Sequence, residues 1–204
     1  MNIENTNYQG LSNDEVFCTV LKNDETAMRV LQAIFPDVKI SQVMLNTAGC
    51  EQDKVNGPLA QVVVLDEDEK KHFHSLRMGK ESDNLGRLGR FCKSKMYMTM
   101  FRLIGEDYFD EDCGAVILCG FNPFGGDDTV KAVSSYRSTK DPDLVLPGQC
   151  PLIIISGKGE EEGESSDMKS LTHVICGDYS LNEPLAVFLK EKIIAANKKL
   201  NLVK

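Results

Sequence analysis

The stretch 59–78 limits the folds open to this chain more than any other part of it. It holds a β-branched run at 62–64, an acidic turn at 66–69 and a second alternating run at 71–78. β-branched residues favour a central strand, and two such runs joined by a short polar turn are typical of a β-hairpin. Alternation along the second run places residues 73, 75 and 77 on one face and residues 72, 74, 76 and 78 on the other.

Helical periodicity follows this hairpin. Apolar residues recur every three or four positions between 85 and 104, which predicts a long helix packed on the sheet. Its expected buried residues are Leu88, Phe91, Cys92, Met96, Met100 and Leu103. Methionines in such a stripe are more typical of core packing than of a cofactor site.

The remaining elements complete an α/β pattern. We expect one helix over 12–21, where Ser12 and Glu15 have the spacing of a capping box, and a second from Asn23 to just before Pro36. Further strands are expected at 39–45, 115–121, 129–136 and 152–156, and a last helix over 180–200. The segment 157–166 is rich in glutamate and is expected to be a loop.

Length and composition indicate one globular domain, 1–204. Of the 204 residues, 42 % are hydrophobic and 26 % are charged, which is ordinary for a globular protein. The apolar runs 115–121 and 152–156 are far shorter than a membrane span, and the N-terminus lacks the pattern of a signal peptide. We therefore expect a cytoplasmic protein with no membrane partner.

The charge is unevenly distributed. The net charge is −8, yet residues 70–102 contain nine basic and two acidic residues, so this segment carries +7 and the rest −15. An acidic chain is not expected to cover nucleic acid as a non-specific coat protein, because phosphate contacts need surplus Lys and Arg. The basic segment therefore points to a localised binding surface or to the solvated face of a strand and a helix.

Cysteine and histidine give no sign of a metal or catalytic site. The seven cysteines are scattered without a CxxC pair, which favours free, buried thiols. His72 and His74 share a strand face, but no third ligand stands at a defined spacing, and the only other histidine is His173. Gly157 to Gly159 lack the spacing of a phosphate loop, so no cofactor is expected.

Six segments in order resemble one known family. The chain is similar to the bacterial Rpn-like recombination-promoting nucleases, also described as PD-(D/E)XK-family transposases, over residues 11–160. The segments that carry the likeness are 11–21, 85–91, 105–108, 115–125, 141–146 and 154–159. The resemblance implies a restriction-endonuclease-like (PD-(D/E)XK) core, a mixed central sheet flanked by helices, with Mg²⁺-dependent DNA cleavage at the hairpin.

The catalytic motif of that family is degenerate in this chain. The family has an Asp on the first hairpin strand and Glu-x-Gln on the second, and an ungapped overlay puts Gln61, Ser75 and Arg77 at these positions. A slip of one residue would put Leu76 and Met78 at the last two. The family sometimes adds a further acidic residue from the first helix. In this chain Asp14 is the one residue that could match that acid. Two carboxylates are needed to offset the charge of the metal ion, and Arg77 supplies a fixed positive charge instead.

Three functions stay open at this point. The first is a catalytically inactive nuclease-like protein that binds DNA, RNA or a protein of a nucleic-acid-handling system, as a regulator or inhibitor of a nuclease or of bacterial defence. Its binding residues would be Arg77, Lys80, Arg87, Arg90 and Lys93. The second is a divergent Mg²⁺-dependent endonuclease using Asp14 with Asp66 or Asp68. The third is an interaction protein that docks a basic partner on the acidic segments 106–112 and 159–164.

Overall fold

The computed structural model describes residues 8–47, 58–105, 112–125, 130–137, 139–141, 143–144, 149–159 and 163–202. Two helices come first, followed by three strands, one long helix, three more strands and two final helices. Their bounds are α1 (Asp14–Leu21), α2 (Asp24–Ile34), β1 (Ile40–Asn46), β2 (Ala60–Asp66), β3 (Lys71–Gly79), α3 (Leu85–Ile104), β4 (Asp112–Cys119), β5 (Lys131–Ser134), β6 (Leu152–Ser156), α4 (Ser166–Ile175) and α5 (Pro184–Lys199).

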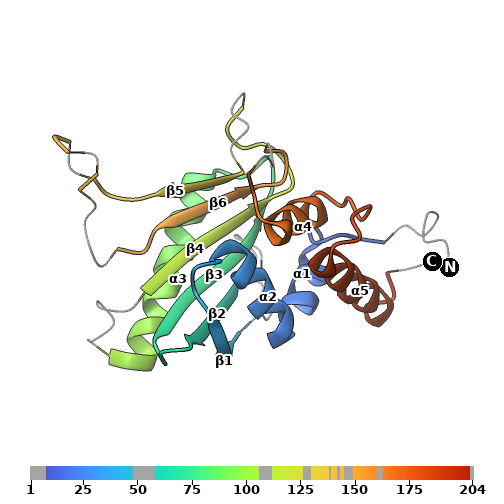
Figure 1. The fold of residues 1–204 in the computed structure, drawn as a ribbon, viewed down its shortest axis with the longest axis horizontal. Coiled ribbons are helices and arrows are strands. Elements are labelled where there is room, and N and C mark those ends of the chain that lie inside the picture. The colour runs from blue at the N-terminus through green and yellow to red at the C-terminus, as the bar shows by residue number, and fades with distance from the viewer. Residues whose placement is uncertain are drawn as a thin grey trace.

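The strands of the described residues form one six-stranded sheet in the order β1-β2-β3-β4-β6-β5 (Figure 1). β1, β2 and β3 form an antiparallel meander, whereas β3, β4 and β6 run parallel and β5 returns antiparallel to β6. The long helix α3 supplies the crossover between the parallel strands β3 and β4, because parallel neighbours cannot be joined by a tight turn. The α/β class and the mixed sheet flanked by helices are thus confirmed.

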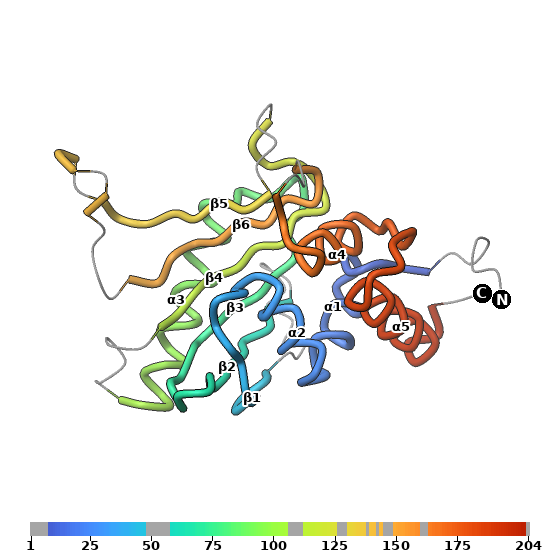
Figure 2. The backbone as a smooth tube through the Cα atoms, viewed as in Figure 1, coloured from blue at the N-terminus to red at the C-terminus, as the bar shows by residue number. Residues whose placement is uncertain are grey.

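The two faces of the sheet are covered by different helices. Alternate strand residues such as Val62, Leu76 and Val116 pack with α1, α2, α4 and α5 in the larger apolar cluster. The opposite residues, such as Phe73 and Ile117, pack against α3, which lies behind the sheet in Figure 1 and in the tube of Figure 2. The predicted division of 71–78 into two faces is confirmed.

Glycine lets α3 approach the sheet closely. A Cβ atom on Gly89 would lie 2.6 Å from Leu152 Cδ2 of β6, closer than two carbon atoms approach without strain. The helix therefore rests directly on β6 at this turn, and the neighbouring residues Leu88 and Cys92 are buried.

Several element ends differ from expectation. α1 is capped by Asn13, whose side-chain oxygen accepts from the main-chain N–H groups of Glu15 and Val16, so the predicted capping box at Ser12 is wrong by one residue. α5 begins at Pro184 with no side-chain cap bond. No helix was expected at α4, whose N-cap Ser165 lies in the predicted loop. Leu103 is 51 % exposed instead of buried, whereas the next residue, Ile104, packs against the apolar cluster under α3.

No helix in the described ranges combines the length and the apolar character that crossing a bilayer requires.

Candidate functional site

The three motif positions lie together on the face that α3 covers. Gln61 of β2 and Ser75 of β3 are directly opposite each other in the antiparallel ladder, and Arg77 follows two residues along the same face. The hairpin thus brings these side chains together as the sequence overlay requires, because residues two apart on one strand point the same way.

Gln61 is bonded to the covering helix. Its side-chain amide Nε2 donates to the main-chain oxygen of Lys95 and to Thr99 Oγ1, each at 2.8 Å. Ser75 is fully buried, and its hydroxyl lies 3.5 Å from the main-chain oxygen of Cys92. Both side chains therefore hold α3 against the sheet and leave no negative charge between them.

Arg77 is a buried cation that forms no ion pair with a described residue. The residue is 5 % exposed, and neither Nε nor Nη1 has a hydrogen-bond partner in the described part of the chain. A guanidinium stays protonated in proteins, so it places a permanent positive charge beside Gln61 and Ser75. A divalent cation at these positions would meet one positive and two neutral side chains.

The remaining acids are far apart. Asp14 Oδ2 is 3.2 Å from Lys80 Nζ, beyond the C-terminal end of β3, whereas Asp66 contacts His72 near the start of that strand. The eight steps along the strand from His72 to Lys80 span about 26 Å at roughly 3.3 Å per residue. Asp14 and Asp66 therefore cannot bind one metal ion. No group of three or more His, Cys, Asp or Glu side chains within the described ranges is arranged to hold a metal ion.

The predicted basic residues have different environments. Arg87 and Arg90 are exposed on the first turns of α3, Lys93 is half-buried, and Lys80 is paired with Asp14. Arg77 lies beneath α3 and cannot reach a macromolecule at the surface.

The exposed side of α3 also carries residues that the sequence reading did not propose for binding. Lys95 and Arg102 are exposed, and Met98, Phe101 and Leu103 are 51–56 % exposed near the C-terminal end of the helix. The sequence signal for this surface was the two apolar residues Met98 and Phe101, which fall outside the predicted buried stripe of the helix. The acidic segments of the third hypothesis lie mostly outside the described residues, at 106–111 and 160–162.

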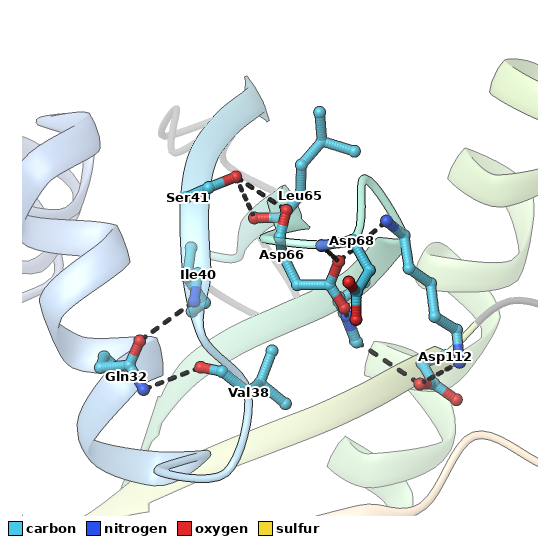
Figure 3. Close-up of polar contacts among 10 residues, drawn as sticks. Gln32, Val38, Ile40, Ser41, Leu65, Asp66, Asp68 and Asp112 are labelled. Carbon is cyan, nitrogen blue, oxygen red and sulfur yellow. Dashed lines mark hydrogen bonds and ion pairs between the residues drawn. The ribbon is translucent and has the colours of Figure 1, made fainter.

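A second polar group lies on the opposite face of the sheet, at the turn of the β2–β3 hairpin (Figure 3). His72 Nε2 is 2.9 Å from Asp66 Oδ2, and His72 Nδ1 is 3.6 Å from Asp112 Oδ2. Lys70 Nζ donates to the same Asp112 oxygen at 2.8 Å. The hydrogen bond from His72 is the main cause of a lowered pKa at Asp66, and the main-chain N–H groups of Lys70 and Asp68 lower it further.

His74 has an unusual environment for a histidine. It is 4 % exposed, stacks on Phe35 with ring centroids 4.5 Å apart, and has no hydrogen-bond partner on either ring nitrogen among the described residues. Burial lowers its pKa to about 3, with the charge of His72 as a second cause. Its ring is therefore neutral at physiological pH.

A pocket of about 480 Å³ borders both histidines. The turn between α2 and β1 forms one wall, and Gln32 fixes this turn by accepting from Ile40 N and donating to the Val38 oxygen (Figure 3). The lining combines apolar and polar groups, a combination suited to a small molecule of mixed polarity: Phe35, Val38, Val133, Pro151, His72, His74, Asp112, Arg137 and Gln149.

Comparison of this chain with family models, with curated proteins and with solved structures gives no match. The nuclease resemblance therefore stays a prediction from the sequence.

Proposed function

We propose that this chain is a catalytically inactive protein of the restriction-endonuclease-like class that works by binding a partner. The α/β fold with a mixed sheet flanked by helices is compatible with the predicted PD-(D/E)XK core. The register that places Gln61 opposite Ser75 on one hairpin supports the overlay of the family motif on this chain. Inhibition or regulation of a nuclease or defence system is the form of activity that suits such a protein.

The observation that carries the proposal is the buried guanidinium of Arg77. Metal-dependent phosphodiester cleavage needs carboxylates that hold a divalent cation and a surface where the phosphate can reach it. Here one motif position holds a cation, the other two are neutral, and α3 covers all three. Charge and access therefore both oppose hydrolysis at this position.

The exposed side of α3 is the surface that best suits a macromolecular partner. Arg87, Arg90 and Lys95 supply positive charge, and Met98 and Phe101 supply exposed apolar area on the same helix. Exposed apolar side chains next to basic ones favour a protein partner with an acidic surface over a phosphate backbone, which would need cations alone.

Catalysis is tested by incubating the purified protein with supercoiled and linear DNA in Mg²⁺ or Mn²⁺. We expect no cleavage above that of a heat-inactivated sample. Cleavage that is abolished by Asp14→Ala would overturn the proposal, since Asp14 is the acid that the family places on the first helix.

Binding is tested with a charge-reversal pair. Arg87→Glu/Arg90→Glu reverses the basic end of α3, and Lys198→Glu/Lys199→Glu, two exposed lysines of α5, makes the same charge change elsewhere. We expect proteins retained from an extract by the wild type to be lost with the α3 variant and kept with the α5 variant. Tight, salt-dependent DNA binding that only the α3 variant loses would instead assign this surface to nucleic acid.

A further inference from the structure

Two cysteines are neighbours on adjacent parallel strands. In the ladder between β4 and β6, Ala115 is opposite Leu152, and the Ala115 N–H donates to the Pro151 oxygen at 2.9 Å. Both strands run in the same direction, so two residues earlier on each lie Cys113 and Cys150. Directly opposite residues of neighbouring strands have Cα atoms about 5 Å apart, within the range that a disulfide spans.

The two side chains also share one face and one environment. Cys150 belongs to the apolar cluster under α3, and Cys113 packs against the same cluster. Each thiol shifts the pKa of the other, because the two sulfur atoms are neighbours. Tyr97 of α3 holds the main chain of Cys150 in place, because the Tyr97 hydroxyl accepts from the Cys150 N–H at 3.0 Å.

We propose that Cys113 and Cys150 form a redox-active dithiol whose oxidant is a small peroxide and whose product is a cross-strand disulfide. The site lies at the edge of the sheet that the described pocket borders, and Cys113 is only half-buried. A small oxidant therefore approaches the pair from the side of Cys113, while Cys150 itself is 2 % exposed.

The reaction takes up one molecule of peroxide. The Cys150 thiolate attacks one peroxide oxygen, the O–O bond breaks, and hydroxide leaves, giving a sulfenic acid on Cys150. Cys113 then attacks this sulfur, the S–S bond forms, and the sulfenic hydroxyl leaves. With the two thiol protons counted, two thiols and one hydrogen peroxide give one disulfide and two water molecules.

Electrostatics distinguishes this pair from the neighbouring cysteines. Burial raises the pKa of Cys92 and of Cys119 to about 12, so these thiols stay protonated and inert. The pKa of Cys150 is lowered, first by the hydrogen bond from Cys113 and also by the nearby charge of Lys93. The same hydrogen bond raises the pKa of Cys113. Cys113 therefore keeps its proton, and Cys150, the more readily ionised thiol, is the attacking sulfur.

The test oxidises the reduced, native protein with equimolar hydrogen peroxide, blocks the remaining thiols by alkylation and maps the tryptic peptides by mass spectrometry. We expect peptides 103–131 and 141–158 linked, with two hydrogens lost, at least tenfold above any other cysteine pairing. Because the first peptide also contains Cys119, fragment ions must place the link at Cys113. The oxidised protein should melt roughly 5–10 °C higher, since the bond closes a long loop.

Two variants separate the dithiol from general oxidation. Cys113→Ser, at a half-buried position, should lose the link and leave Cys150 as a sulfenic acid, the product of one equivalent of peroxide. Cys176→Ser is the matched control: Cys176 is also half-buried, and its thiol donates to the Gly157 oxygen at 3.0 Å, so the link should persist. Recovery of Cys113 and Cys150 from the wild type as unlinked thiols or unlinked sulfinic acids, or linked to other cysteines, would overturn the proposal.

Discussion

The neutral, buried His74 makes the stability of this protein sensitive to mild acid. Its pKa is about 3 in the folded protein, because burial opposes the charged form, and 6.5 is the ordinary value that applies to the unfolded chain. Between these two values the unfolded chain binds one more proton than the folded protein. Stability is therefore complete above pH 6.5 and is lost as the pH falls from 6.5 toward 3.

The magnitude follows from linkage. Each pH unit in this window removes about 1.36 kcal/mol, so a shift from pH 7 to pH 5 lowers the free energy of unfolding by about 2 kcal/mol. For a chain of this size that loss corresponds to a fall in melting temperature of roughly 4–8 °C. Urea unfolding, followed by circular dichroism at pH 7, 6 and 5, measures it directly.

The variant His74→Leu isolates this contribution, because it keeps a similar volume beside Phe35 and removes the titrating ring. Most of the difference between pH 7 and pH 5 should disappear in it. The control is His173→Gln, which removes a half-buried histidine that has a carboxylate partner, Asp178 at 2.8 Å, and leaves His74 intact. If His74→Leu retains the full wild-type pH dependence while His173→Gln abolishes it, the assignment to His74 is refuted.

Three further predictions concern the two faces of the sheet. Arg77→Met should raise the free energy of unfolding by about 2–4 kcal/mol, because it removes buried donors, Nε and Nη1, that find no partner among the described residues; a loss above about 1 kcal/mol in urea unfolding would contradict this. Gly89→Ala should be about 2 kcal/mol less favourable than Gly86→Ala in the same assay, since a Cβ atom meets Leu152 only at position 89, and equal effects would be inconsistent with the close packing of α3. The pKa of Asp66 is lowered in the folded protein, so its contribution is present above about pH 4 and is lost as the pH falls through the lowered pKa. Asp66→Asn should destabilise the protein at pH 6 and weaken its further loss of stability below pH 4; an unchanged acid profile would argue against the bond to His72.

Local patterns in the sequence were sufficient for most elements. The alternation at 71–78 predicted which residues of β3 share a face, because side chains on a strand point alternately to opposite sides. The helical period at 85–104 predicted α3 with Met96 and Met100 in the core. The expected start of the second helix at Asn23 is confirmed to within one residue, because Asn23 is the N-cap of α2 and its side chain accepts from the Thr26 N–H. Each of these features depends on residues only a few positions apart.

Other elements depend on distant contacts. α4 is short, begins in a polar stretch and is held by packing of Met168, Leu171 and Val174 into the larger apolar cluster, so its own sequence carries a weak signal. Leu103 likewise could not be recognised as exposed, since the helical period alone does not show that Ile104 packs against the sheet in its place.

The sequence by itself determined that the three positions of the family motif cannot supply carboxylate ligands to a metal ion, because Gln61, Ser75 and Arg77 carry no carboxylate in any conformation. It also determined the order of elements that brings these residues onto one hairpin. Only the tertiary structure decided that α3 covers all three, that His72 lies between Asp66 and Asp112, and that the pairing of Ala115 with Leu152 brings Cys113 and Cys150 into one apolar cluster. The register of strands far apart in the chain fixes these contacts, and that register depends on how both faces of the sheet pack as a whole.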